Sequence, residues 1–341
     1  MCVGCRLLKK FLLQRTSFFF LAIIMRMGDT KILGKVRTRQ NPGFFYKKRP
    51  WVYEPLWKGN TSMPPLTDKV IWITGASSGI GSALVTELYQ AGAKLILSSR
   101  QKDVLEQIAS HLDPLKTNIS VLPLDLILLE TLESKTHEAW QLFGKIDVFI
   151  GCAGISQRAF IEDMDLCVYE HLLKVNFLSN VVITKALIPK MKAAGAGQLV
   201  YISSILGEVG IRTRAAYAAS KYALNGYVEV LRSEVWEHNI KVSLVSPGFI
   251  KTATAQNSLD AHGIPFGQND QDTQKGLEAS VVAKKIHSVI VQQKEKAYCA
   301  KFVPMLLVYL KRFCPIYIRY ALKRYKPNAE KQLVKGKQQK K

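Results

Sequence analysis

The sequence predicts one α/β domain built on a doubly wound parallel sheet and flanked by two basic ends. Short apolar runs rich in β-branched residues recur between residues 66 and 300, and each interval between them can hold a helix. The runs are continuously apolar, which is typical of strands buried on both faces. In chain order they are "KVIWIT", "KLILSS", "ISVLPLD", "IDVFIG", "QLVYIS" and "IKVSLVS".

The positive charge lies at the two ends of the chain. The formal net charge is +22, yet residues 1–60 hold 13 Lys/Arg against 2 Asp/Glu, and residues 301–341 hold 12 against 1. The remaining stretch, 61–300, is neutral. A neutral domain lacks the basic surface of a nucleic-acid-binding fold, so we expect no nucleic-acid partner.

Residues 1–28 have the composition of a targeting or anchoring segment. They contain no acidic residue, and the apolar run Phe18–Met25 has only eight residues, whereas a full membrane span needs about 20. Basic residues on both sides favour a signal anchor or an interfacial helix at a membrane, with a mitochondrial transit peptide or a soluble tail as alternatives. Residues 29–65, aromatic and basic, are predicted to be a linker or a surface arm.

The C-terminal extension, residues 301–341, is basic. Its stretch Phe302–Tyr325 mixes large apolar residues with five Lys/Arg. This stretch either lies on an anionic membrane surface as an amphipathic segment or packs on the domain as a C-terminal helix.

A glycine-rich loop directly follows the first apolar run. In "TGASSGIG", Gly75, Gly79 and Gly81 lie between a predicted strand and a predicted helix. Without Cβ atoms the backbone can approach a pyrophosphate, and the helix N-terminus offers free N–H groups. The loop predicts a Rossmann-type fold that binds a dinucleotide, with contacts from Gly75, Ser77, Ser78, Gly79, Ile80 and Gly81.

The end of the second apolar run bears on the choice of cofactor. Proteins that prefer NAD usually place an acidic residue here for the ribose hydroxyls, whereas this chain has Ser98, Ser99 and Arg100. The guanidinium fork of Arg100 suits a 2′-phosphate. We therefore expect NADP(H) to be favoured over NAD(H), through Ser99 and Arg100, with a solvated surface arginine as the alternative.

The stretch "YAASK" places Tyr217 and Lys221 on one face of a predicted helix. There the ammonium would stabilise a phenolate and lower the pKa of Tyr217. A phenol tuned in this way can exchange a proton with a substrate alcohol or carbonyl. Ser204, at the end of "QLVYISS", is expected to hydrogen-bond the same oxygen, with Ser203 as the alternative.

With these motifs in this order, residues 66–300 resemble the short-chain dehydrogenase/reductase family, and most of all a membrane-associated subgroup of it. The resemblance implies that Tyr217 is the general acid/base, that Lys221 also binds the nicotinamide ribose, and that Ser204 orients and polarises the substrate. It also implies that Asn176, in "KVNF", lies on a kinked helix whose water links Lys221 to solvent.

Further cofactor contacts are implied by the same resemblance. Asp125, in "LPLDL", matches a residue that contacts the adenine, and "SPGFIKT" matches a segment that closes over the nicotinamide through Pro247, Gly248 and Thr252. Each of two residues has an alternative role when it is considered alone. Asp125 could only cap a helix, and Asn176 could be an amide on a helix surface.

One motif departs from the family. The usual Asn-Asn-Ala-Gly after the fourth strand is here "GCAG", Gly151 to Gly154. The change removes side-chain hydrogen bonds that help hold the central sheet, while backbone contacts from Ala153 and Gly154 to the cofactor remain expected. No metal site is expected, because the six histidines lie far apart in the sequence.

The expected reaction is reversible hydride transfer between NADP(H) and a carbonyl or alcohol carbon of a small lipophilic substrate, such as a steroid, a retinoid or a lipid carbonyl. We expect an endoplasmic-reticulum membrane location, with the mitochondrion as the alternative, and a homodimer or homotetramer. The rival hypotheses are an NAD-dependent steroid or retinol dehydrogenase and a non-catalytic membrane-bound scaffold of the same fold.

Overall fold

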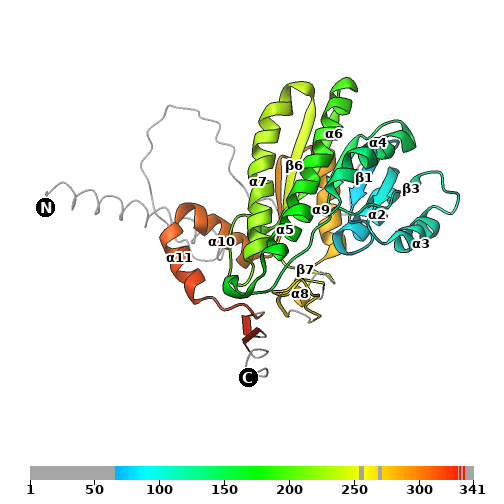
Figure 1. Ribbon diagram of the computed structural model, residues 1–341. Helices are drawn as coiled ribbons and strands as arrows, with labels where there is room; N and C mark the ends of the chain where they lie inside the picture. Colours follow the sequence, from blue (N-terminus) through cyan, green and yellow to red (C-terminus); the bar gives the residue numbers. More distant parts are fainter. Residues whose placement is uncertain (1–65, 253–256, 268–270, 329, 332, 335–341) are drawn as a thin grey trace, which may run out of the picture. The chain divides into compact units, whose positions relative to one another are not determined.

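The structure is a computed structural model (Figure 1) that describes residues 66–252, 257–267, 271–328, 330–331 and 333–334. The segments 1–28 and 29–65, predicted to be an anchor and a linker, lie outside the described residues.

A parallel sheet of seven strands forms the centre of the domain, in the order β3-β2-β1-β4-β5-β6-β9. The chain order reverses between β1 and β4, and open α/β sheets bind ligands at such a switch point, beyond the carboxyl ends of the strands. Six strands correspond to the predicted runs: β1 (Val70–Thr74), β2 (Lys94–Ser98), β3 (Ile119–Val121), β4 (Val148–Gly151), β5 (Gly197–Ile202) and β6 (Ile240–Pro247). The seventh, β9 (Lys296–Cys299), was not predicted, because "KAYC" is short and only partly apolar.

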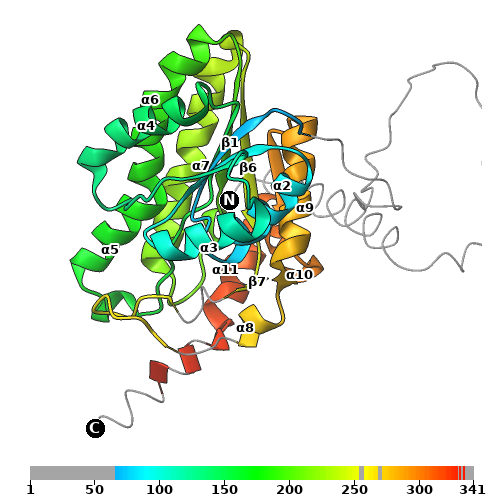
Figure 2. The same ribbon diagram turned by 90° about the vertical axis from the view of Figure 1, so that its right-hand side faces the viewer.

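Helices cover both faces of the sheet, as Figure 2 shows. One layer contains α2 (Gly79–Gln90), α3 (Lys102–Leu112) and α9 (Ala279–Gln292). The other contains α4 (Leu132–Phe143), α5 (Leu166–Leu173), α6 (Ser179–Ala193) and α7 (Ala215–Val235).

The side chains of β1 divide between two apolar cores. Ile71 and Ile73 pack in the core that contains α2 and α9, whereas Val70 and Trp72 pack in the core that contains α4, α6 and α7. Successive residues of a strand point to opposite faces. A strand with a core on each side must therefore be apolar throughout, which explains the continuous runs in the sequence.

Helices α5 and α6 are joined by a π-helical turn, η3 (Lys174–Leu178), so the predicted kinked helix around Asn176 is present. Among the described helices, the continuous stretch Leu166–Ala193 is the one long and apolar enough to cross a membrane. Its residues Ile183, Leu187 and Met191 are buried in the core on the sheet.

Short elements border the carboxyl ends of the strands or connect the helices. They are η1 (Leu129–Thr131), η2 (Ile161–Asp163), η4 (Ile205–Gly207), η5 (Trp236–His238), α8 (Gln271–Gln274), and a two-stranded sheet of β7 (Ile250–Lys251) and β8 (Leu277–Glu278).

Two helices follow β9: α10 (Phe302–Phe313) and α11 (Pro315–Arg324). Val308 of α10 is buried against Ile205 and Val209, at and just beyond η4. The C-terminal extension predicted from its charge therefore begins with a helix that packs on the domain.

Candidate active site

The glycine-rich loop is tightly folded against its neighbours. Gly75 has φ +72°, and a Cβ at this position would come within 2.8 Å of the Ala153 Cα atom. A Cβ at Gly81 would lie 2.0 Å from the carbonyl oxygen of Gly75. Side chains at these positions would block the turn that leads from β1 into α2, where the first helical N–H groups have no intrahelical partner.

A cleft of about 830 Å³ opens beside this loop, at the switch point of the sheet. Its size, and the glycines of the loop among its lining residues, suit an extended dinucleotide. Twelve of the predicted cofactor-binding residues line it: Gly75, Ser77, Ser78, Gly79, Ile80, Gly81, Ser99, Arg100, Asp125, Ala153, Gly154 and Thr252.

Arg100 lies at the end of β2, exposed at the wall of this cleft. Ser98 also lines it, with its buried hydroxyl accepting a hydrogen bond from the Trp72 indole at 2.9 Å. The Ser99 hydroxyl oxygen accepts a hydrogen bond from the Gln101 N–H at 3.1 Å. Of the four residues at this strand end, only Arg100 brings a charge to the cleft.

Asp125 also lines the cleft, and its Oδ1 atom accepts a hydrogen bond from the Ile127 N–H at 3.1 Å. This is a local turn and not the helix cap considered as an alternative, since Leu128 and Thr131 are the N-cap residues of the helices that follow. The turn fixes the orientation of the carboxylate. Asp125 therefore lines the cleft and forms a local turn at the same time.

Ser204 and Tyr217 meet in a smaller cleft of about 190 Å³. The Ser204 hydroxyl hydrogen-bonds the Tyr217 phenol, and its oxygen also accepts the Leu206 N–H at 3.1 Å. Ser203, the alternative, also lines this cleft, but its hydroxyl donates a hydrogen bond to the Asn225 side chain on α7. The structure thus brings the second serine of the pair to the phenol.

Lys221 lies on the same side of α7 as Tyr217, with its Nζ atom 5.9 Å from the centroid of the phenol ring. The ammonium is buried and donates a hydrogen bond to the Ile202 carbonyl at 2.9 Å. Burial lowers the pKa of Lys221 to about 8. Both residues line the smaller cleft.

The predicted effect on the pKa of Tyr217 was wrong for the protein without cofactor. Burial raises the pKa of the phenol, and the opposing effects of the Ser204 hydrogen bond and the Arg214 charge do not offset it. Loss of hydration disfavours the phenolate, and this outweighs nearby positive charge. Tyr217 is therefore a protonated acid at neutral pH.

Asn176 lies behind the cleft wall and is fully buried. Its Nδ2 atom donates to the Ile155 carbonyl and to the Ser220 hydroxyl, each at 2.9 Å, and its Oδ1 atom accepts the Ile155 N–H at 2.9 Å. The amide thereby ties the loop after β4 to α7. Gly154 lies between Asn176 and Lys221, because a Cβ there would be 3.3 Å from the amide oxygen and 3.4 Å from Nζ.

The two clefts adjoin. The residues that line both of them are Ile80, Cys152, Gly154, Ile155 and Thr252, so the larger cleft meets the site of Ser204 and Tyr217 at this junction. Two further predicted cofactor residues, Pro247 and Gly248, line the smaller cleft.

Comparisons with known proteins agree with this geometry. The family model "short chain dehydrogenase" matches residues 69–263. The chain is 35% identical to "Dehydrogenase/reductase SDR family protein 7-like" of Drosophila melanogaster over 73% of this chain and 78% of the relative. It is also 35% identical to "Dehydrogenase/reductase SDR family member 7B" of Mus musculus, over 73% of this chain and 79% of the relative. The chain belongs to the short-chain dehydrogenase family.

Among solved structures, ElxO with NADP bound is 26% identical to this chain, with a TM-score of 0.60, and covers 69% of this chain and 97% of its own. The resemblance to the short-chain dehydrogenase/reductase family inferred from the motifs is thus confirmed, and this member of the family is by that membership an oxidoreductase.

The departure "GCAG" is accommodated by other side chains. The space that a side chain at position 151 would need is taken by Asn180, whose amide donates to the Asn176 carbonyl at 3.2 Å. The Thr74 hydroxyl donates to the Ile150 carbonyl and accepts the Ala153 N–H, each at 3.4 Å. Side-chain hydrogen bonds therefore still hold the central strands where the family's asparagines are missing.

Several residues of the clefts were not found from the sequence, among them Arg214, His171 and Cys152. Arg214, almost fully buried, lines the smaller cleft and donates to the Gln157 carbonyl at 2.8 Å. Its position three residues before Tyr217 was an available signal. His171 lines the larger cleft, where burial and then Arg100 lower its pKa. Cys152 lines both clefts, and burial raises the pKa of its thiol to about 12.

Within the part of the chain that the structure describes, no cluster of three or more His, Cys, Asp or Glu residues has the arrangement of a metal site.

Proposed function

We propose that this short-chain dehydrogenase interconverts a carbonyl and an alcohol on a small lipophilic substrate, with NADP(H) as its preferred cofactor. The observation that carries the proposal is the hydrogen-bonded pair of Ser204 and Tyr217 at the junction of the two clefts, with Lys221 beside it. When bound, the nicotinamide would supply or accept the hydride.

In the reducing direction the protein has to supply a proton. The raised pKa keeps the proton on the Tyr217 phenol at neutral pH, ready for transfer to the substrate oxygen. Ser204 can hydrogen-bond that same oxygen, since its hydroxyl already contacts the phenol. Asn176 acts indirectly, by holding the loop after β4 against α7.

The preference for NADP(H) rests on Arg100. Its guanidinium lies at the wall of the larger cleft, at the strand end where an acidic residue would favour NAD. The related ElxO, solved with NADP bound, supports a nicotinamide dinucleotide as the cofactor.

The lipophilic substrate class is supported by the walls of the smaller cleft. Ile80, Ile202, Leu206, Phe249 and Ile250 line it. Polar side chains also line it, among them Ser204, Arg214 and Tyr217. Apolar walls beside such polar groups suit a small molecule with an apolar body and a polar group that has to be oriented. A membrane location, at the endoplasmic reticulum or the mitochondrion, and a homo-oligomeric state stay predictions from the sequence.

The test is consumption of NADPH and of NADH by the purified full chain with a panel of carbonyl compounds: a long-chain aldehyde, a retinal and a ketosteroid. We expect turnover with NADPH and much weaker turnover with NADH. Turnover with NADH alone would favour the NAD-dependent alternative. NADPH binding without turnover on any carbonyl or alcohol would favour the scaffold.

The role of Arg100 is tested in the same assay. Arg100→Ala should weaken NADPH binding by about 1.5–3 kcal/mol, the scale of a hydrogen bond to a charged group, and leave NADH binding nearly unchanged. Lys102→Ala removes a neighbouring positive charge that pairs with Glu106 and does not line the cleft, so it serves as the matched control. Equal losses for both cofactors would remove the basis for the preference.

A further inference from the structure

Helices α10 and α11 expose a concentration of large apolar side chains. Their exposed fractions run from 39% for Leu306 to 77% for Tyr317. Only Val308 and Ile318 of the two helices are buried. The exposed residues, called here the C-terminal helical surface, are Phe302, Val303, Leu306, Tyr309, Phe313, Ile316, Tyr317 and Tyr320.

This surface is basic as well as apolar. Residues 302–325 contain five Lys/Arg and no Asp or Glu. Arg312 and Arg319 are exposed among the apolar side chains. Aromatic and aliphatic residues interleaved with basic ones are the composition of helices that lie in the interface of an anionic bilayer.

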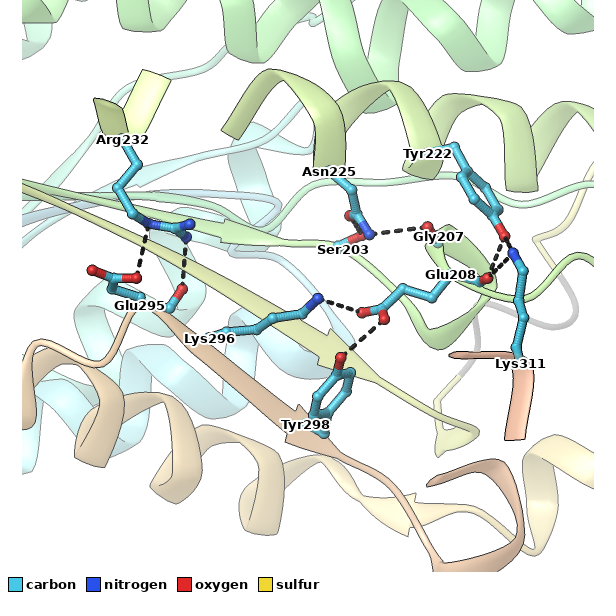
Figure 3. Close-up of polar contacts among 10 residues, drawn as sticks. All are labelled: Ser203, Gly207, Glu208, Tyr222, Asn225, Arg232, Glu295, Lys296, Tyr298 and Lys311. Carbon is cyan, nitrogen blue, oxygen red and sulfur yellow. Dashed lines mark hydrogen bonds and ion pairs between the residues drawn. The ribbon is translucent and has the colours of Figure 1, made fainter. Parts of the chain in front are cut away.

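The opposite side of α10 reaches the active site. Pro304 lines the smaller cleft together with Ser204 and Tyr217. Further along the helix, Lys311 donates hydrogen bonds to the Glu208 carbonyl and to the Tyr222 hydroxyl, as Figure 3 shows.

Glu208 is fixed in turn by two more residues. Its carboxylate accepts a hydrogen bond from the Tyr298 hydroxyl at 2.9 Å and pairs with Lys296 at 3.0 Å (Figure 3). Glu208 lies directly after η4, the turn that follows Ser204. α10 is thus bound to the segment that carries the serine of the site.

We propose that the C-terminal helical surface docks on an anionic lipid bilayer and that a carbonyl compound dissolved in the bilayer passes from there into the smaller cleft beside Pro304. The second half of this statement rests on the proposed function; the docking does not. The surface has the apolar area to enter the interface and the positive charge to be drawn to anionic headgroups.

Charge decides against a second copy of the chain as the occupant. A two-fold contact would place the same patch on both sides of the interface. The exposed basic residues Arg312, Arg319, Lys323 and Arg324 would then meet their own copies, with no acidic residue between 302 and 325 to pair them. An anionic bilayer offers the complementary charge at every position of the surface.

Amide hydrogen exchange of the full chain tests the docking, because it reports on α10 and α11 separately from any membrane contact of residues 1–65. Vesicles of equal parts phosphatidylcholine and phosphatidylserine should slow exchange of the α10 and α11 amides by about tenfold or more, and phosphatidylcholine vesicles should slow it far less. Phe313→Ser with Ile316→Ser should abolish the slowing. Leu115→Ser with Trp236→Ser, which removes equally exposed apolar groups elsewhere, should preserve it.

Exchange in α10 and α11 that ignores anionic vesicles would overturn the docking. So would slowing that grows with protein concentration in the absence of vesicles, since it would identify a second copy as the occupant.

A separate kinetic assay tests whether the substrate passes from the bilayer into the smaller cleft. With hexadecanal dissolved in the anionic vesicles, the Phe313/Ile316 variant should show a KM raised by about tenfold, while the KM for water-soluble nitrobenzaldehyde should stay unchanged. Equal KM changes for both aldehydes would overturn the passage. If neither aldehyde is reduced by the unaltered chain, the proposed function fails, and the exchange result alone still decides the docking.

Discussion

The Asn180 side chain occupies the space that a side chain at position 151 would need: its Oδ1 atom lies 2.2 Å from where a Cβ of residue 151 would stand. The family's usual residue there is asparagine, and this chain has glycine. The amide of α6 thus fills the end of β4 from the neighbouring layer.

Restoring the asparagine should therefore destabilise the protein. Gly151→Asn forces Asn180 or the backbone to move, and overpacking of this kind costs about 1–3 kcal/mol of unfolding free energy. Gly151→Asn combined with Asn180→Ala should recover much of the loss. Gly226→Ala, at a helical glycine with open space around it, should be neutral or stabilising in the same denaturant titration. A stable single variant would show that the space adapts freely.

Substitutions of the two serines that follow β5 should have different effects, one on stability and the other on turnover. Ser203→Ala removes the partner of a buried Asn225 and should cost about 1–3 kcal/mol of stability, with turnover of the folded enzyme little changed. Ser204→Ala removes a donor aimed at the substrate oxygen and should lower kcat by about 10²–10³-fold, with NADPH affinity retained. Thermal unfolding and steady-state kinetics on both variants check this, and a reversed pattern would assign the wrong serine to the site.

The strands β1 to β6 and the pairing of Tyr217 with Lys221 could be predicted from the sequence, because each depends on residues that are close together in the chain. The continuous apolar runs specify strands buried on both faces, and "YAASK" needs only one helical turn to align Tyr217 with Lys221. The choice between Ser203 and Ser204 was left open, because both serines contact α7 and local sequence does not show which one meets Tyr217 and which one meets Asn225.

The features that were missed depend on contacts between distant residues. Strand β9 owes its place to pairing with β6, which the short "KAYC" does not reveal. Pro304 reaches the cleft only because α10 folds back on η4. The pKa of Tyr217 follows from how deeply the folded chain buries the phenol, so a rule based on helical spacing gave the wrong direction.

Lys221 should impose a pH dependence on cofactor binding. Burial lowers its pKa to about 8, so in the free enzyme the ammonium is present below that pH and lost above it. Neither Cys152, with a pKa of about 12, nor Tyr217, with its raised pKa, titrates between pH 7 and 9. If the cofactor binds the charged form, NADPH affinity falls above pH 8 by up to about tenfold per pH unit.

Lys221→Met tests this dependence, because methionine has similar length and no charge. Its NADPH affinity should be lower than that of the unaltered chain at pH 7 and should vary much less between pH 7 and 9. Fluorescence titration of NADPH at several pH values gives both quantities. A variant that keeps the full pH dependence would place its origin in another group.

The most direct measurement of the site is the turnover of Tyr217→Phe with NADPH and one carbonyl compound that the unaltered chain reduces. Phenylalanine keeps the ring and its packing but removes the proton that Tyr217 holds beside Ser204. Turnover should fall by about 10²–10⁴-fold, the loss typical of a missing general acid, while NADPH affinity and thermal stability change little. Turnover close to that of the unaltered chain would contradict the assignment of Tyr217 as the acid of this enzyme.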